Sequence, residues 1–123
     1  METEHGSGWA IGSIDGLGEG PGFRKIRAPL GVTAFGVNAI VLPPGYETNR
    51  HYHERQEELY LVMSGEVELQ FGDGERRALG PGGLARMDAT TVRSVRNTSA
   101  TAETVYVCVG GAGGYVGRDG VVP

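Results

Sequence analysis

The sequence contains only one cysteine, one lysine and one tryptophan among its 123 residues. The single cysteine, Cys108, has no partner for an internal disulfide, which fits a protein of the reducing cytoplasm. No apolar run approaches the ~20 residues that span a membrane. The first residues also lack the positive start and apolar stretch of a secretory signal. We therefore expect a cytoplasmic protein without a membrane partner.

Positive charge is also scarce, with 11 Lys and Arg residues against 15 Asp and Glu residues and a net charge of -4. A nucleic-acid-binding domain normally presents a basic face, so we expect no nucleic-acid partner. The chain has the length of one domain. It is long enough to bury about two thirds of its unfolded surface, so it can fold without disulfides.

Glycine is abundant, with 22 residues that show no collagen period and lie mostly between short apolar runs. Polar and apolar residues alternate over 66–71, which is typical of a strand, and Gly-Asp-Gly at 72–74 predicts a hairpin turn. No apolar pattern has helical spacing over ten or more residues. Short strands separated by frequent turns predict an all-β sandwich or closed barrel. The expected strands cover 9–14, 23–27, 33–42, 48–53, 58–63, 66–71, 75–79, 84–88, 92–97 and 101–109.

The composition divides the chain into three parts without an internal linker. Residues 1–8 are polar or glycine, so we expect a loose arm. Residues 9–110 contain the expected strands. Residues 111–123 are glycine-rich, and we expect a tail that runs over the surface.

Two of the three histidines, His51 and His53, are two residues apart, so on a strand their side chains point to the same side. Four residues later Glu58 begins the next expected strand, which can direct its carboxylate at the same point. Two imidazoles and a carboxylate suit zinc, iron, nickel or manganese. The alternative is a solvated pair of histidines beside an ordinary polar turn, because so short a motif also occurs by chance.

The spacing around these residues resembles the first motif of the cupin superfamily. It runs from Gly45 through His51, His53 and Glu58 to Gly65. The resemblance covers about residues 33–109 and implies a small antiparallel jelly-roll β-barrel with its ligand site inside. It also implies that His51, His53 and Glu58 bind a divalent metal ion. Family members commonly form dimers, so we expect a homodimer.

The second motif of the family is altered, because Arg93 stands where a third histidine is expected. The turn at 79–83 and Asn97 match the usual pattern. Arginine has no lone pair to offer a metal ion. Three interpretations follow: Arg93 binds an anionic substrate beside a three-ligand metal, it pairs with Glu58 and replaces the metal charge, or it faces solvent.

Other side chains of the expected barrel are candidates for the cavity wall. Tyr60 has the same parity as Glu58 and is expected to contact the bound molecule, whereas Val62 is expected in the core. Tyr106 points inward unless the valines of opposite parity do so. Cys108 is expected to be an inert buried thiol, since no histidine is left to activate it.

The sequence thus predicts a cupin barrel that binds a divalent metal ion and a small polar or anionic molecule. One function class is a metal-dependent dioxygenase, isomerase or lyase. The other is a non-catalytic binding or sensor protein, including a metal-free form in which Arg93 supplies the positive charge.

Overall fold

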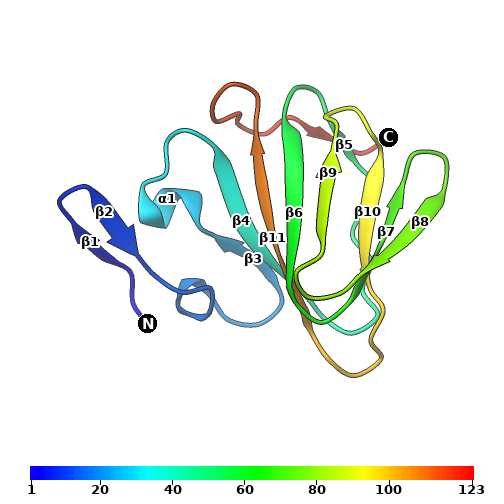
Figure 1. The fold of residues 1–123 in the computed structure, drawn as a ribbon, viewed down its shortest axis with the longest axis horizontal. Coiled ribbons are helices and arrows are strands. Elements are labelled where there is room, and N and C mark those ends of the chain that lie inside the picture. The colour runs from blue at the N-terminus through cyan, green and yellow to red at the C-terminus, as the bar shows by residue number, and fades with distance from the viewer.

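The structure, a computed structural model, describes all 123 residues and is built almost wholly of strands (Figure 1). Its helical parts are one turn of 3-10 helix, η1 (Asp15–Leu17), and the four-residue helix α1 (Arg27–Leu30). The all-β prediction is therefore confirmed. The strands are β1 (Glu4–Gly6), β2 (Trp9–Ile11), β3 (Gly22–Lys25), β4 (Gly36–Leu42), β5 (Tyr52–His53), β6 (Glu57–Ser64), β7 (Val67–Phe71), β8 (Glu75–Leu79), β9 (Leu84–Met87), β10 (Arg93–Asn97), β11 (Thr104–Gly111) and β12 (Gly120–Val121).

Two antiparallel sheets form the body of the molecule. The larger has the strand order β3-β4-β11-β6-β9, and the smaller has the order β10-β7-β8. Single bridges from Glu47 to Arg96 and from His51 to Arg93 place the segment before β5 along the free edge of β10. The two sheets converge at one end and diverge at the other (Figure 1), and we call the wider end the mouth of the barrel.

The core lies between the two sheets and follows from the alternation of side chains along each strand. On β6 the side chains of Glu58, Tyr60 and Val62 are buried, whereas Glu57 and Leu59 are exposed. Val67 and Leu69 of β7 enter the same core. Burial of apolar area stabilises such a core by about 25 cal/mol per Å². The strand predicted from the period of two over 66–71 is therefore confirmed over 67–71, with one buried face.

The turn between β6 and β7 depends on Gly65, whose φ of 74° lies in the left-handed region. A side chain there would be strained by this conformation. A Cβ atom would also come within 2.5 Å of the Thr104 hydroxyl. Gly65 thus sets the return of the chain from the larger sheet to the smaller one.

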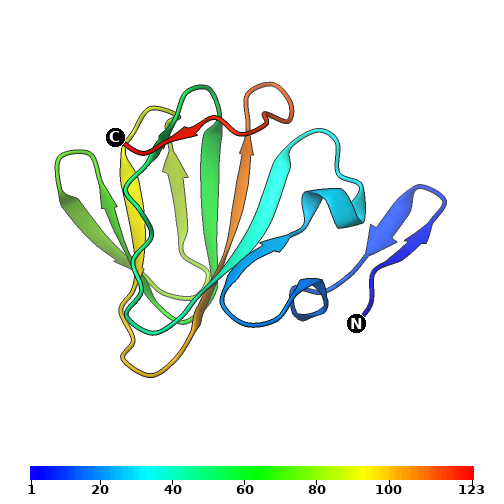
Figure 2. The same ribbon diagram turned by 180° about the vertical axis from the view of Figure 1, so that it is seen from behind.

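Both ends of the chain contain short paired strands. Residues 4–6, expected to be part of a loose arm, pair with residues 9–11 as the hairpin β1–β2. Near the C-terminus, β12 pairs with β5, and the chain crosses the upper end of the barrel (Figure 2). Composition alone cannot reveal either pairing, because each depends on a partner strand.

None of the helices has the length and apolar character needed to cross a membrane.

Candidate metal centre and cavity

The three predicted ligands come from neighbouring segments at the mouth of the barrel. His51 lies beside Arg93 of β10, His53 lies on β5, and Glu58 lies on β6. One ligand atom from each lies within 4.8 Å of the other two, a spacing that suits a shared metal ion. The two imidazole rings are 5.3 Å apart and nearly perpendicular, so residues two apart do share a side.

Both imidazoles have one nitrogen engaged by an oxygen that can only accept a hydrogen bond. His51 Nδ1 lies 3.0 Å from the Asn49 carbonyl oxygen, and His53 Nδ1 lies 2.7 Å from an Asp119 carboxylate oxygen. Each Nδ1 therefore carries the proton, and in a neutral ring each Nε2 carries the lone pair. This arrangement of outer partners is the one that orients histidine ligands in metal sites. Burial lowers the pKa of His51, which favours its neutral form.

Glu58 is buried yet ionised. Burial alone would raise its pKa, but hydrogen bonds from His53, Cys108 and Arg93 outweigh that effect and hold the pKa at about 2. The hydrogen bond with Glu58 correspondingly raises the pKa of His53. The two side chains approach to 3.3 Å through His53 Nε2. In the absence of a metal ion, a proton on His53 completes this ion pair.

Arg93 has no exposed surface, and its Nη2 atom lies 2.5 Å from Glu58 Oε1. Its Nη1 atom donates to the carbonyl oxygens of Asp88, Ala89 and Thr91. The interpretation in which Arg93 faces solvent is therefore wrong. The loop before β10 supplies these carbonyl oxygens and so turns the guanidinium inward. Because its donors are engaged by protein groups, a direct contact with a substrate would require Arg93 to give up part of this network.

Tyr60 and Cys108 complete the hydrogen bonds around Glu58. The Tyr60 hydroxyl donates to Glu58 Oε1 at 3.0 Å and accepts a bond from Arg93 Nε at 3.2 Å. Cys108 Sγ donates to Glu58 Oε2 at 3.0 Å. Burial raises the pKa of Cys108, so the thiol is protonated and fits the expectation of an inert group. Glu57, the neighbour of Glu58, instead faces outward and pairs with Arg86.

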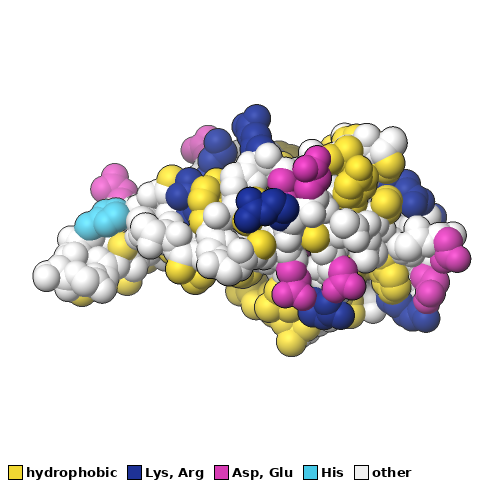
Figure 3. Space-filling model, turned by 90° about the horizontal axis from the view of Figure 1, so that it is seen from above, with side chains coloured by type: hydrophobic (Ala, Val, Ile, Leu, Met, Phe, Trp, Pro, Cys, Tyr) yellow, Lys and Arg dark blue, Asp and Glu magenta, His cyan; other side chains and the backbone are white.

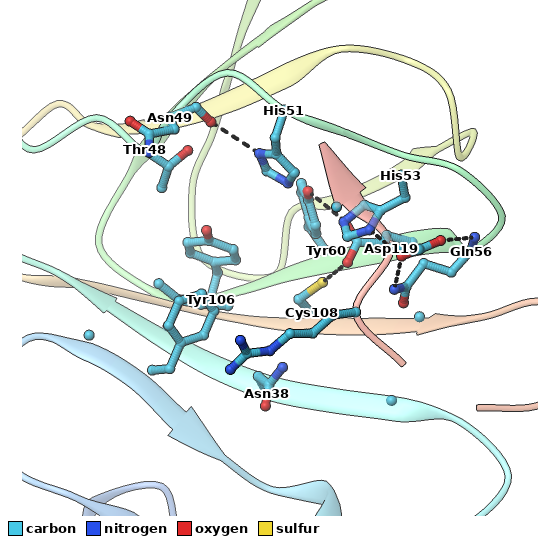
Figure 4. A pocket seen from close by; sticks show the side chains of 18 of the residues that line it. Asn38, Thr48, Asn49, His51, His53, Gln56, Tyr60, Tyr106, Cys108 and Asp119 are labelled. Carbon is cyan, nitrogen blue, oxygen red and sulfur yellow. Dashed lines mark hydrogen bonds and ion pairs between the residues drawn. The ribbon is translucent and has the colours of Figure 1, made fainter. Parts of the chain in front are cut away.

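A cavity of about 780 Å³ opens beside the three ligands. Tyr106 and Cys108 project into it from β11, and the histidines approach from the opposite wall (Figure 4). Tyr106 is 5% exposed, so the alternate residues of β11 that include Tyr106 face inward. Figure 3 shows the same end of the molecule from above, where acidic, basic and apolar side chains are interspersed rather than grouped by sign.

Asp119 is the site residue that the sequence interpretation missed. Its carboxylate accepts hydrogen bonds from His53 Nδ1, the Gln56 side chain and the backbone N–H groups of Arg55 and Gln56. Burial would raise its pKa, but these bonds lower it below the usual range. No short-range signal could have found it, because 66 residues separate it from His53.

Residues 38–110 match the family described as the cupin domain. This protein belongs to the cupin family. The matched segment contains His51, His53 and Glu58 and all strands from β5 to β10, so the resemblance inferred from the first motif is confirmed.

Two solved structures show how widely this cupin fold is shared. A sugar phosphate isomerase of the cupin superfamily from Silicibacter pomeroyi is 28% identical, with a TM-score of 0.65 over 72% of this chain and 57% of that chain. An uncharacterised conserved protein with a double-stranded β-helix domain from Klebsiella pneumoniae is 22% identical. It has a TM-score of 0.76 over 91% of this chain and 89% of that chain. The second likeness concerns the fold alone.

Among curated proteins, a probable Xaa-Pro aminopeptidase P from Sordaria macrospora is 34% identical over 74 residues, or 59% of this chain. A protein of the same description from Neurospora crassa is equally similar. The cupin chain spans only about 12% of the length of the first of these relatives. The similarity therefore concerns a small segment of a much longer protein.

Proposed function

We propose that this cupin binds a divalent metal ion through His51 Nε2, His53 Nε2 and the Glu58 carboxylate. A small polar or anionic molecule then lies beside the ion in the cavity. The observation that carries the proposal is the engagement of both Nδ1 atoms, which leaves two lone pairs next to one buried carboxylate. This donor set suits zinc, iron, manganese or nickel.

His51, His53 and Glu58 would hold the ion, which would supply Lewis acidity toward a substrate oxygen or, if it is redox-active, a site for dioxygen. The reaction classes that fit are an isomerase, a lyase or a dioxygenase. The likeness to a sugar phosphate isomerase supports the first of these. In this proposal Arg93 and Tyr60 hold Glu58 in place next to the bound molecule, and the Asp119 carboxylate holds the His53 ring.

A second candidate is a metal-free binding protein in which Arg93 supplies the charge that a metal ion would bring. It is favoured by the ion pair between Arg93 and Glu58 at 2.5 Å, because the guanidinium already balances the negative charge of the carboxylate. A cation so close to the ligands also weakens metal binding through Coulomb repulsion. The two candidates differ in one measurable property, which is the metal affinity of the unmodified protein.

The test is metal content and metal affinity of protein prepared without a histidine tag. We expect the wild type to bind one divalent ion per chain and the His53→Ala variant to lose it. His5→Ala is the matched control, since His5 lies in the exposed hairpin β1–β2. Equal metal content in wild type and His53→Ala would refute the site. A wild type that takes up no metal while Arg93→His does would establish the metal-free candidate.

A further inference from the structure

Arg118 is the one basic side chain, counting arginine and lysine, in the wall of the cavity. Arg93 does not line the cavity. Arg93 is fully buried, and its guanidinium is committed to Glu58, Tyr60 and three carbonyl oxygens. Arg118 is exposed and makes no hydrogen bond or ion pair with the protein. Among the protein side chains of the wall, Arg118 therefore offers the positive charge that is free to bind a ligand.

The segment that bears Arg118 is fixed on both sides of it. We call residues 115–122, which cross the mouth of the barrel, the C-terminal strap. Asp119 binds His53 and Gln56, and β12 pairs with β5. On the other side, the Tyr115 ring lies 4.0 Å below the guanidinium of Arg27. The backbone of Arg118 is thus held at the cavity wall while its side chain stays free.

The other charges of the cavity are already compensated. Glu58 pairs with Arg93, and the Asp119 carboxylate accepts hydrogen bonds from His53, Gln56 and two backbone N–H groups. No acidic group of the wall is left to pair with Arg118. A ligand that brings a negative charge would therefore find Arg118 as the uncompensated cation among the side chains of the wall.

Two uncharged donors in the same cavity also lack protein partners. The Tyr106 side chain is 5% exposed, and no group of the protein bonds its hydroxyl. Burial raises the pKa of Tyr106, so the hydroxyl keeps its proton. Asn38 of β4, which pairs with Cys108 of β11, presents a free side-chain amide to the cavity as well. Both groups line the cavity without a protein partner, so their hydrogen-bonding capacity is free for a bound molecule.

We propose that Arg118, Tyr106 and Asn38 recognise the substrate, and that its class is a small hydroxylated molecule bearing a carboxylate or phosphate. The oxyanion binds the Arg118 guanidinium, and hydroxyl or carbonyl groups bond Tyr106 and Asn38. The inference rests on the proposed function, since it places this molecule in the cavity beside His51, His53 and Glu58. The cavity of about 780 Å³ is large enough for a molecule of sugar-phosphate size.

The test is calorimetric binding of two anions, glycolate and glycerol 3-phosphate, and of their neutral counterparts, ethylene glycol and glycerol. Measurements are made at low ionic strength, with and without bound metal, on wild type, Arg118→Gln and Arg55→Gln. Arg55 is the matched control, since it is an exposed arginine at the same end of the barrel and outside the cavity wall. The comparison of the two anions distinguishes a carboxylate substrate from a phosphate ester.

We expect the wild type to bind at least one anion about tenfold or more tighter than its neutral counterpart. Arg118→Gln should remove this preference and leave metal affinity unchanged, whereas Arg55→Gln should change neither. The proposal is overturned if the wild type binds no anion better than the neutral compound, or if Arg118→Gln binds the anion as tightly as the wild type. A wild type that binds the anions but no metal would refute the proposed metal site alone.

Discussion

Arg93 shows how one substitution within a familiar pattern changes the electrostatics of a site. Its guanidinium places a fixed positive charge beside the Glu58 carboxylate. The same carboxylate also contacts the side chains of Tyr60, Cys108 and His53. The usual histidine at this position would instead add a fourth lone pair. The charge and coordination of the whole centre therefore depend on this residue.

We expect Arg93→His to tighten metal binding by about tenfold or more. The change removes the positive charge beside Glu58 that repels a metal ion. Each 1.4 kcal/mol of relieved repulsion raises the affinity by a factor of ten. Chelator competition measures the affinity, and Arg86→His is the control, since Arg86 is an exposed arginine paired with Glu57 and Asp88. An unchanged affinity in Arg93→His would show that the Arg93 charge does not act on the metal site.

Glu58 should make the stability of the metal-free protein depend on acid pH. Its pKa falls from 4.5 to about 2 on folding, so its contribution is complete above about pH 4.5 and is lost as the pH falls through 2. Glu58→Gln leaves the buried Arg93 charge unpaired, which should cost about 3–5 kcal/mol at neutral pH. In urea titrations, the difference between wild type and variant should shrink from pH 5 to pH 2. A difference that stays constant over that range would contradict the assignment.

At the scale of elements, the C-terminal strap connects the end of the chain to the candidate metal centre. Its Asp119 carboxylate binds His53 and the two backbone N–H groups of the bend between β5 and β6. The same bend separates His53 from Glu58. The strap thus holds the bend that brings two of the three ligands together.

Removal of the Asp119 side chain should therefore weaken metal binding without touching a ligand. We expect Asp119→Ala to lower metal affinity by about 10–100-fold, the usual effect of losing an outer partner of a histidine ligand. Asp119→Asn keeps an acceptor for His53 Nδ1–H and should restore part of the loss. Asp73→Ala, at the exposed β7–β8 turn, serves as control. If Asp119→Ala binds metal like the wild type, the strap has no positioning role.

At the scale of the whole molecule, stability depends on the core between the two sheets. Leu69 is 2% exposed and belongs to the core cluster, whereas Leu84 is 61% exposed. We expect Leu69→Ala to lower the free energy of unfolding by about 2–5 kcal/mol and Leu84→Ala by less than about 0.5 kcal/mol. Urea denaturation measures both, and similar losses for the two would place the core elsewhere.

The expected homodimer stays a prediction at this scale. Phe23 on the edge strand β3 and Trp9 on β2 are exposed apolar side chains near the N-terminal end of the barrel. If they lie in a dimer interface, Phe23→Asp should shift the protein from dimer to monomer in analytical ultracentrifugation. A wild type that sediments as a monomer at all concentrations would exclude the homodimer.

The sequence by itself determined what depends on local pattern. The period of two at 66–71 and the placement of His51 and His53 on one side follow from strand geometry, and both are present. The same alternation placed Glu58 and Tyr60 inward. Such features need only the chain neighbours of each residue.

Only the tertiary structure decided what depends on contacts between distant segments. It turned Arg93 inward onto Glu58, 35 residues away, because backbone carbonyl oxygens and Tyr60 satisfy its remaining donors. It also brought Asp119 to His53 and Arg118 into the cavity wall, from a tail that was expected only to run over the surface. A charged side chain points wherever its partners lie, and those partners are assembled only when the sheets close.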